Sequence, residues 1–141
     1  MRMSDRRPVR FVVVGILNTA IDFAILFLLT SLGTPLFIAN VISTSIAFAF
    51  SFFANRSYTF RAGGDARTQL VKFAAVTLFG LWILQPMVIW AVTALIGGFV
   101  DTPLALLIGK GCATVVSMLW NYVLYARFVF PPAPDVQEVV E

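Results

Sequence analysis

The chain contains four long runs of apolar residues, separated by short connections. The runs cover residues 11–32, 36–55, 72–97 and 104–126. Each run holds roughly 20 residues or more, the length that an α-helix needs to cross a hydrocarbon layer of about 30 Å. A helix satisfies its own backbone hydrogen bonds inside lipid. The pattern therefore predicts an all-α integral membrane protein with four transmembrane helices.

The second and fourth runs contain segments that are similar to each other. Residues 39–60 read ANVISTSIAFAFSFFANRSYTF, and residues 109–130 read GKGCATVVSMLWNYVLYARFVF. Small, polar and aromatic residues stand at matching positions: Ala39 and Gly109, Asn40 and Lys110, Thr44 and Thr114, Ser51 and Asn121, Phe60 and Phe130. The first helices of the two units agree mainly at Arg10-Phe11 and Lys72-Phe73. Because the repeated unit holds two runs, both copies start on the same side, which predicts a parallel duplicated helical hairpin.

The basic residues lie on one side of the predicted spans. Nine of the ten Lys and Arg residues flank that side: Arg2, Arg6, Arg7, Arg10, Arg56, Arg61, Arg67, Lys72 and Arg127. The connections near residues 33–34 and 98–102 contain none. The positive-inside rule then predicts that both termini and the middle loop are cytoplasmic. The formal net charge of +3 follows this topology and attraction to membrane lipids, so we expect no nucleic-acid partner.

The composition excludes several classes of function. Hydrophobic residues make up 60% of the chain, and only 12% are charged, about half the usual share. There is no histidine and a single cysteine, Cys112, so neither an intramolecular disulfide nor a His/Cys metal site is expected. Of seven acidic residues only Asp22 lies inside a predicted span. We therefore expect no cofactor and no enzymatic activity.

Two charged residues, Asp22 and Lys110, lie inside the spans. A charge at the centre of a span costs at least about 2.5–3.5 kcal/mol on insertion scales. Counting from Arg10 and Pro103 at about 1.5 Å per residue places both charges at similar depths, roughly 18–20 Å from the cytoplasmic face. Two interpretations stay open: a structural ion pair, or a polar groove that admits a lipid headgroup. Burying both charges without water is costly, which favours the groove.

Other polar residues extend these two positions along the helices. Lys110, Thr114, Ser117 and Asn121 share one helix face, while Asn40 and Thr44 stand at matching positions in the second span. Asn18 lies one turn before Asp22. Arg56 and Arg127 lie at the cytoplasmic mouths of spans two and four, where either topology or phosphate binding explains them equally well. The small residues on the same helices are explained by close helix packing.

The third span differs because it contains Gln85-Pro86 and little other polarity. Pro86 removes the backbone hydrogen bond to the Trp82 carbonyl, which predicts a kink. A moving hinge and a static, tolerated proline are equally consistent with the sequence. Whether this span lines any path is open.

Residues 10–23, 39–60, 71–73 and 109–130 resemble the GtrA-like family of small four-span membrane proteins. The resemblance implies a GtrA-like transmembrane domain at 10–130, preceded by a basic cytoplasmic segment at 1–9. Residues 131–141 are then an acidic cytoplasmic tail that we expect to be disordered. It also implies a location in the inner membrane of a bacterium. Asp22, Asn40, Arg56, Lys110 and Asn121 fall where this family tends to carry polar residues.

The family's implied role is to move a polyprenyl-phosphate-linked monosaccharide from the cytoplasmic to the outer leaflet, for O-antigen or cell-wall glycosylation. Arg56 and Arg127 would attract the phosphate, and the polar faces of spans two and four would pass the sugar, with Lys110 as a deeper counter-charge. Four helices are too few to enclose a wide pore, so we expect a groove or a homo-oligomer. The alternative is a non-transporting anchor that recruits a polyprenyl-phosphate glycosyltransferase.

Overall fold

The computed structural model describes residues 6–131. Arg2 and nearly all of the predicted acidic tail lie outside these residues. Four helices are long and apolar enough to cross a membrane: Arg7–Ser31, Leu36–Thr59, Ala66–Ile96 and Thr102–Val129. The residues described contain no strand. These observations confirm the predicted all-α class and its four spans, each of which starts or ends several residues beyond its apolar run.

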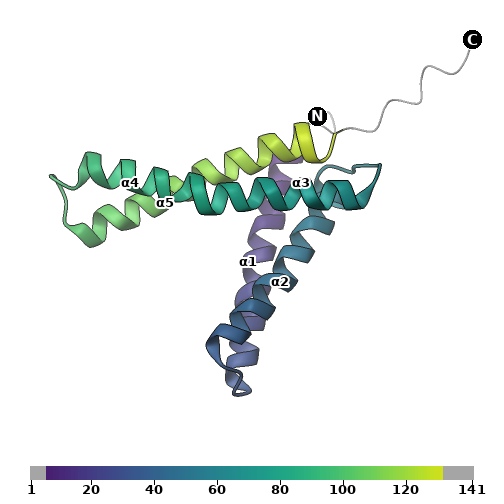
Figure 1. The fold of residues 1–141 in the computed structure, drawn as a ribbon, viewed down its shortest axis with the longest axis horizontal. Helices are drawn as coiled ribbons and strands as arrows, with labels where there is room; N and C mark the ends of the chain where they lie inside the picture. Colours follow the sequence, from purple (N-terminus) through teal and green to yellow (C-terminus); the bar gives the residue numbers. More distant parts are fainter. Residues whose placement is uncertain (1–5, 132–141) are drawn as a thin grey trace, which may run out of the picture. The chain divides into compact units, whose positions relative to one another are not determined.

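The chain divides into two compact units, and each is a helical hairpin. The first hairpin contains α1 (Arg7–Ser31) and α2 (Leu36–Ala54), which continues into a π-helical turn, η2 (Asn55–Thr59). The two helices lie side by side (Figure 1). Gly33, with a φ of +87°, ends α1. Its N–H bonds to the Thr30 carbonyl while the Thr34 N–H bonds to Leu29, a Schellman motif that starts the tight connection.

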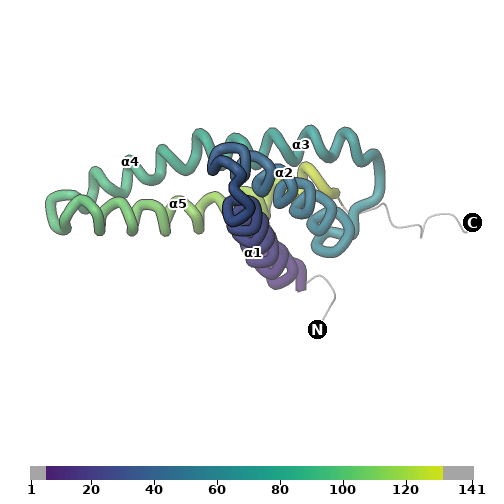
Figure 2. Tube along the Cα trace, turned by 90° about the horizontal axis from the view of Figure 1, so that it is seen from below, coloured from purple at the N-terminus to yellow at the C-terminus, as the bar shows by residue number. Residues whose placement is uncertain are grey.

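The second hairpin has a longer first arm. It contains α3 (Ala66–Phe79), a π-helical turn η3 (Gly80–Leu84), α4 (Gln85–Ile96), α5 (Thr102–Leu124) and a final π-helical turn η4 (Tyr125–Val129). Figure 2 shows α3 and α4 following one another as one arm, with α5 returning beside it. Asp65 and Asp101 cap the starts of α3 and α5 by accepting backbone N–H bonds, which satisfies donors that a helix start leaves free.

Small residues form the seam within each hairpin. The buried positions are Ala39, Ser43 and Ala47 on α2, and Gly109, Ala113 and Ser117 on α5. A Cβ added at Gly109 would lie 3.4 Å from the Ile89 carbonyl of α4. The repeated small residues thus let each second helix approach the first helix of its own hairpin.

The internal repeat also includes the first helices. Phe11 and Phe73 are 62 residues apart, and each packs on the phenylalanine that follows its hairpin's final π turn, Phe60 or Phe130. Beyond η3 the separation becomes 63 residues. There, Thr30 and Thr93 each donate to the carbonyl four residues earlier. A π turn holds one residue more than an α turn, which explains the change. The parallel relation of the two hairpins stays a prediction.

The helix before Pro86 departs from α-helical geometry through a π turn, whereas the kink expected from the sequence stays a prediction. The α-helical stretch ends at Phe79 and restarts at Gln85. Between them the Gln85 N–H bonds to the Gly80 carbonyl across the wider π turn. Pro86 occupies the first turn of α4, where the missing N–H of a proline costs least.

Candidate functional site

Lys110 meets a polar partner within its own hairpin. Its Nζ donates a hydrogen bond of 2.8 Å to the Gln85 Oε1, which lies at the start of α4. The third span therefore contributes a polar group next to Lys110, while the question whether it lines a path stays open. An ammonium has three donors, and Gln85 takes one. The acids of this hairpin, Asp65 and Asp101, cap the starts of α3 and α5. Asp101 stands nine residues before Lys110, roughly 13 Å along the helix.

Asp22 meets a polar partner in the first hairpin. The Thr44 hydroxyl donates to the Asp22 Oδ1 at 3.5 Å, a long contact. Asp22 is half-buried, and α2 carries no charged residue at all. Each hairpin thus holds one intramembrane charge whose nearest partner is neutral. The predicted ion pair between Asp22 and Lys110 depends on how the hairpins are placed, and it stays a prediction.

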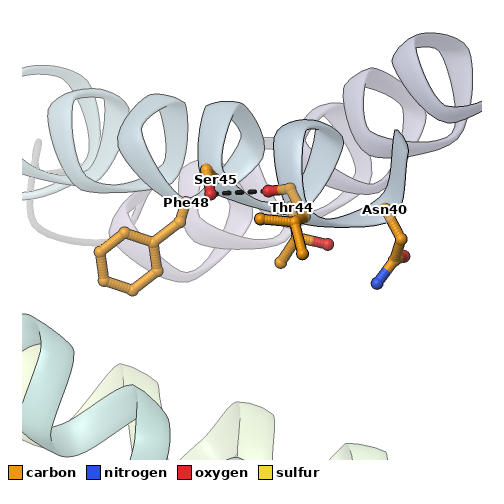
Figure 3. Close-up of a pocket in the computed structure, with 5 residues that line it drawn as sticks. Asn40, Thr44, Ser45 and Phe48 are labelled. Carbon is orange, nitrogen blue, oxygen red and sulfur yellow. Dashed lines mark hydrogen bonds between the residues drawn. The ribbon is translucent and has the colours of Figure 1, made fainter. Parts of the chain in front are cut away.

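A pocket lies on the exposed side of α2 next to Thr44. Its lining residues are Asn40, Val41, Thr44, Ser45 and Phe48. Figure 3 shows the side chains of Asn40, Thr44 and Phe48 along one side of the helix, while Ser45 turns its hydroxyl back to the helix. That hydroxyl bonds to the Val41 carbonyl at 2.6 Å. The sequence pointed to Asn40 and Thr44 and missed Phe48, although the spacing of four residues repeats once more to reach it.

The remaining amides and Thr114 are placed differently from one another. Thr114 donates to the Lys110 carbonyl of its own helix at 2.8 Å, so its hydroxyl is already used. The Oδ1 atoms of Asn18 and Asn121 are buried, and no partner within residues 6–131 bonds to them. A Cβ at Gly80 would lie 3.4 Å from the Asn121 Oδ1. Gly80 thus makes room for Asn121 beside the π turn.

The two arginines of the final π turns, Arg56 in η2 and Arg127 in η4, have different surroundings. The Arg56 guanidinium donates from Nη2 to the Gly64 carbonyl at 3.0 Å, which holds the loop after η2. Arg127 is exposed on η4, and no hydrogen bond or ion pair engages it within the described chain. Arg127 is therefore available to an anionic headgroup, while Arg56 also stabilises the loop.

Each final π turn also has a cation beside it that the sequence did not single out as a site residue. Arg10 lies 5.3 Å from the ring centroid of Tyr58, and Lys72 lies 4.7 Å from that of Phe128. Both rings belong to the final π turns, and both cations to the start of the first helices. The sequence signal was the match of Arg10-Phe11 with Lys72-Phe73. Each hairpin thus places a cation–π pair at its open end.

Comparisons with known proteins agree with these observations. A family model described as GtrA/DPMS, transmembrane domain, matches residues 10–130. The chain is also 28% identical, over 123 residues, to the uncharacterized membrane protein YngA of Bacillus subtilis (strain 168). That alignment covers 86% of this chain and 77% of the relative. The family match confirms the resemblance found in the sequence and extends through both hairpins.

Proposed function

We propose, because this chain belongs to the GtrA/DPMS transmembrane family, that it moves a polyprenyl-phosphate-linked monosaccharide across the bacterial cytoplasmic membrane. The family is associated with translocation of polyprenyl-phosphate sugars. The direction is from the cytoplasmic to the outer leaflet, where the sugar serves cell-surface polysaccharide or cell-wall glycosylation. Four candidate spans and the polar groups inside them support this role.

One observation carries the proposal: Lys110 lies in a span, and within its own hairpin its ammonium donates to a neutral amide, that of Gln85. An ammonium in hydrocarbon is expensive, and the Gln85 Oε1 satisfies one donor without removing the charge. A phosphate is the natural counter-ion, because it offers several acceptor oxygens to the remaining donors. Charge attraction then favours the headgroup at this depth, where lipid alone would reject it.

The prenyl chain stays in the bilayer in this proposal. The side of α5 that carries Lys110 also exposes large apolar side chains, among them Leu106 and Leu107. The same helix therefore presents a polar group to the headgroup and an apolar surface to the tail. At the cytoplasmic end, Arg127 gives the phosphate its first contact.

The test is lipid-sugar translocation by the purified protein in sealed vesicles. Replacing Lys110 with Gln should lower the rate at least tenfold, while Lys110→Arg should retain a substantial part of it because the charge remains. Arg67→Gln is the control, since it removes an exposed charge outside the apolar run at 72–97. If Lys110→Gln transports at the wild-type rate, Lys110 is structural and the proposed mechanism fails.

A second candidate function is a non-transporting anchor that recruits a polyprenyl-phosphate glycosyltransferase. The ordered loop after η2 favours it, because Arg56 fixes the Gly64 carbonyl and Arg61 has a φ of +50°. Such a preformed loop could present a surface to an enzyme. If Arg61→Ala abolishes enzyme recruitment while the Lys110 variants change nothing, the anchor is correct.

A further inference from the structure

We propose that the α2 pocket binds the sugar of the lipid-linked substrate, and that it selects neutral or amino sugars over acidic ones. The pocket is lined by Asn40, Val41, Thr44, Ser45 and Phe48, with Asp22 behind Thr44. The inference rests on the proposed function, since it names the class of sugar that the carrier lipid bears.

The groups around the pocket fit the two faces of a monosaccharide. The Asn40 side chain offers both donors and an acceptor, and the Asp22 carboxylate accepts from hydroxyls. Phe48 supplies an apolar ring, against which the C–H face of a sugar can pack. The Thr44 hydroxyl reaches Asp22 only at 3.5 Å, so a sugar hydroxyl can compete for the carboxylate. The amide, the carboxylate and the ring together match a molecule that is polar at its edge and apolar on its face.

The charge of this hairpin explains the selectivity. Asp22 is the only charged residue of α1 and α2 beyond the first turn of α1, whose basic residues end at Arg10. Arg10 stands twelve residues earlier, roughly 18 Å along the helix. In a medium of low dielectric, a like charge near Asp22 is strongly disfavoured. A hexuronate would bring such a charge, whereas a hexose brings none and an amino sugar brings the opposite one.

The second hairpin provides the contrast. The residues that match Asn40, Thr44 and Phe48 are Lys110, Thr114 and Met118. A cation replaces the amide there, and a methionine replaces the phenylalanine. The matching face of the second hairpin therefore suits an anionic group rather than a neutral sugar.

The test compares three synthetic short-prenyl phosphates: one carrying a hexose, one the matching hexuronate and one no sugar. Their binding to the protein in nanodiscs is measured by competition. The wild-type protein should prefer the hexose by on the order of tenfold, equivalent to about 1.4 kcal/mol. Asp22→Asn should reduce that preference to less than about threefold by admitting the hexuronate. Asp101→Asn, which removes the same charge elsewhere, should keep the preference.

A second variant guards against misfolding of the first. Phe48→Leu should weaken the hexose lipid several-fold relative to the lipid without sugar, because the packing face is lost. An unchanged hexose-to-hexuronate ratio in Asp22→Asn would overturn the proposal, as would equal loss of all three lipids in Phe48→Leu. Translocation is read separately through Lys110→Gln. If the wild-type protein shows the expected sugar selectivity but no translocation, the sugar pocket is supported and the proposed transport function fails.

Discussion

The two hairpins carry the same positions but exchange the chemistry between their helices. In the first hairpin the charge is on the first helix, Asp22, and the neutral amide is on the second, Asn40. In the second hairpin Gln85 replaces the acid, and Lys110 replaces the amide. The small residues at matching seam positions are buried in both hairpins. Packing positions are thus constrained by helix contact, while the polar positions beside them are free to differ and to specialise.

The open ends of the hairpins differ in how tightly they are packed, and aromatic truncation should reveal it. Phe73 is 1% exposed and stacks on Tyr125 at 4.7 Å between centroids, whereas Phe11 is half-buried. Phe73→Ala should cost about 3–5 kcal/mol of unfolding free energy, and Phe11→Ala clearly less. Unfolding of the purified protein in detergent micelles measures both. Phe27→Ala, at a site 70% exposed, is the control; equal losses at Phe11 and Phe73 would contradict the comparison.

The next contrast concerns one matched pair of buried side chains. Thr59 and Val129 are each 1% exposed, but the Thr59 hydroxyl has no partner within residues 6–131. An unsatisfied buried hydroxyl costs about 1–3 kcal/mol. Thr59→Val should therefore raise the free energy of unfolding by about 1 kcal/mol or more, and Val129→Thr should lower it. A loss of stability in Thr59→Val would mean that a bound molecule already satisfies the hydroxyl.

A smaller effect should follow from a hydrogen bond that only the second hairpin makes. The Tyr125 and Thr77 hydroxyls lie 2.5 Å apart, while the matching positions of the first hairpin are Asn55 and Gly15. Tyr125→Phe should lower the free energy of unfolding by about 1 kcal/mol. A double-mutant cycle with Thr77→Val should show coupling of similar size. Additive losses would show that the two hydroxyls do not stabilise each other.

The smallest expected difference is between the two cation–π pairs. Lys72→Gln should lower the free energy of unfolding by about 0.5–1 kcal/mol, because the contact with Phe128 is lost. Arg10→Gln should cost slightly more, because Arg10 also donates to the Tyr58 carbonyl at 3.4 Å. Arg67→Gln, at an exposed site, is the control. Losses of unfolding free energy no larger than that of the control would show that the cation–π pairs do not stabilise the open ends.

The sequence was sufficient to predict the four spans and the repeat between the second helices of the hairpins, α2 and α5. Apolar length determines spans, and small or polar residues at Asn40 and Lys110 stand out in an apolar background. The first helices were harder, because one additional residue in Gly80–Leu84 shifts the match and hides the relation of Asp22 to Gln85. A comparison at a single fixed separation cannot detect such a shift.

The contacts of the site were less predictable than its residues. Two features that the sequence did not assign, the Gln85 partner of Lys110 and the Phe48 wall of the pocket, depend on helix rotation. Arg56 and Arg127 look equivalent in the sequence, yet the loop conformation at Gly64 occupies one of them. Such differences arise from backbone carbonyls, whose directions no residue pattern specifies.

The π turn between α3 and α4 is also a place where the chain can lose one residue without breaking the helix. Removing one residue from Gly80–Leu84 should leave an uninterrupted helix with the same spacing between matched residues as in the first hairpin. The same deletion in α1, between Val14 and Asp22, would rotate the carboxylate by about 100° away from Thr44. A single-codon deletion is therefore expected to be tolerated in one arm and disruptive in its counterpart.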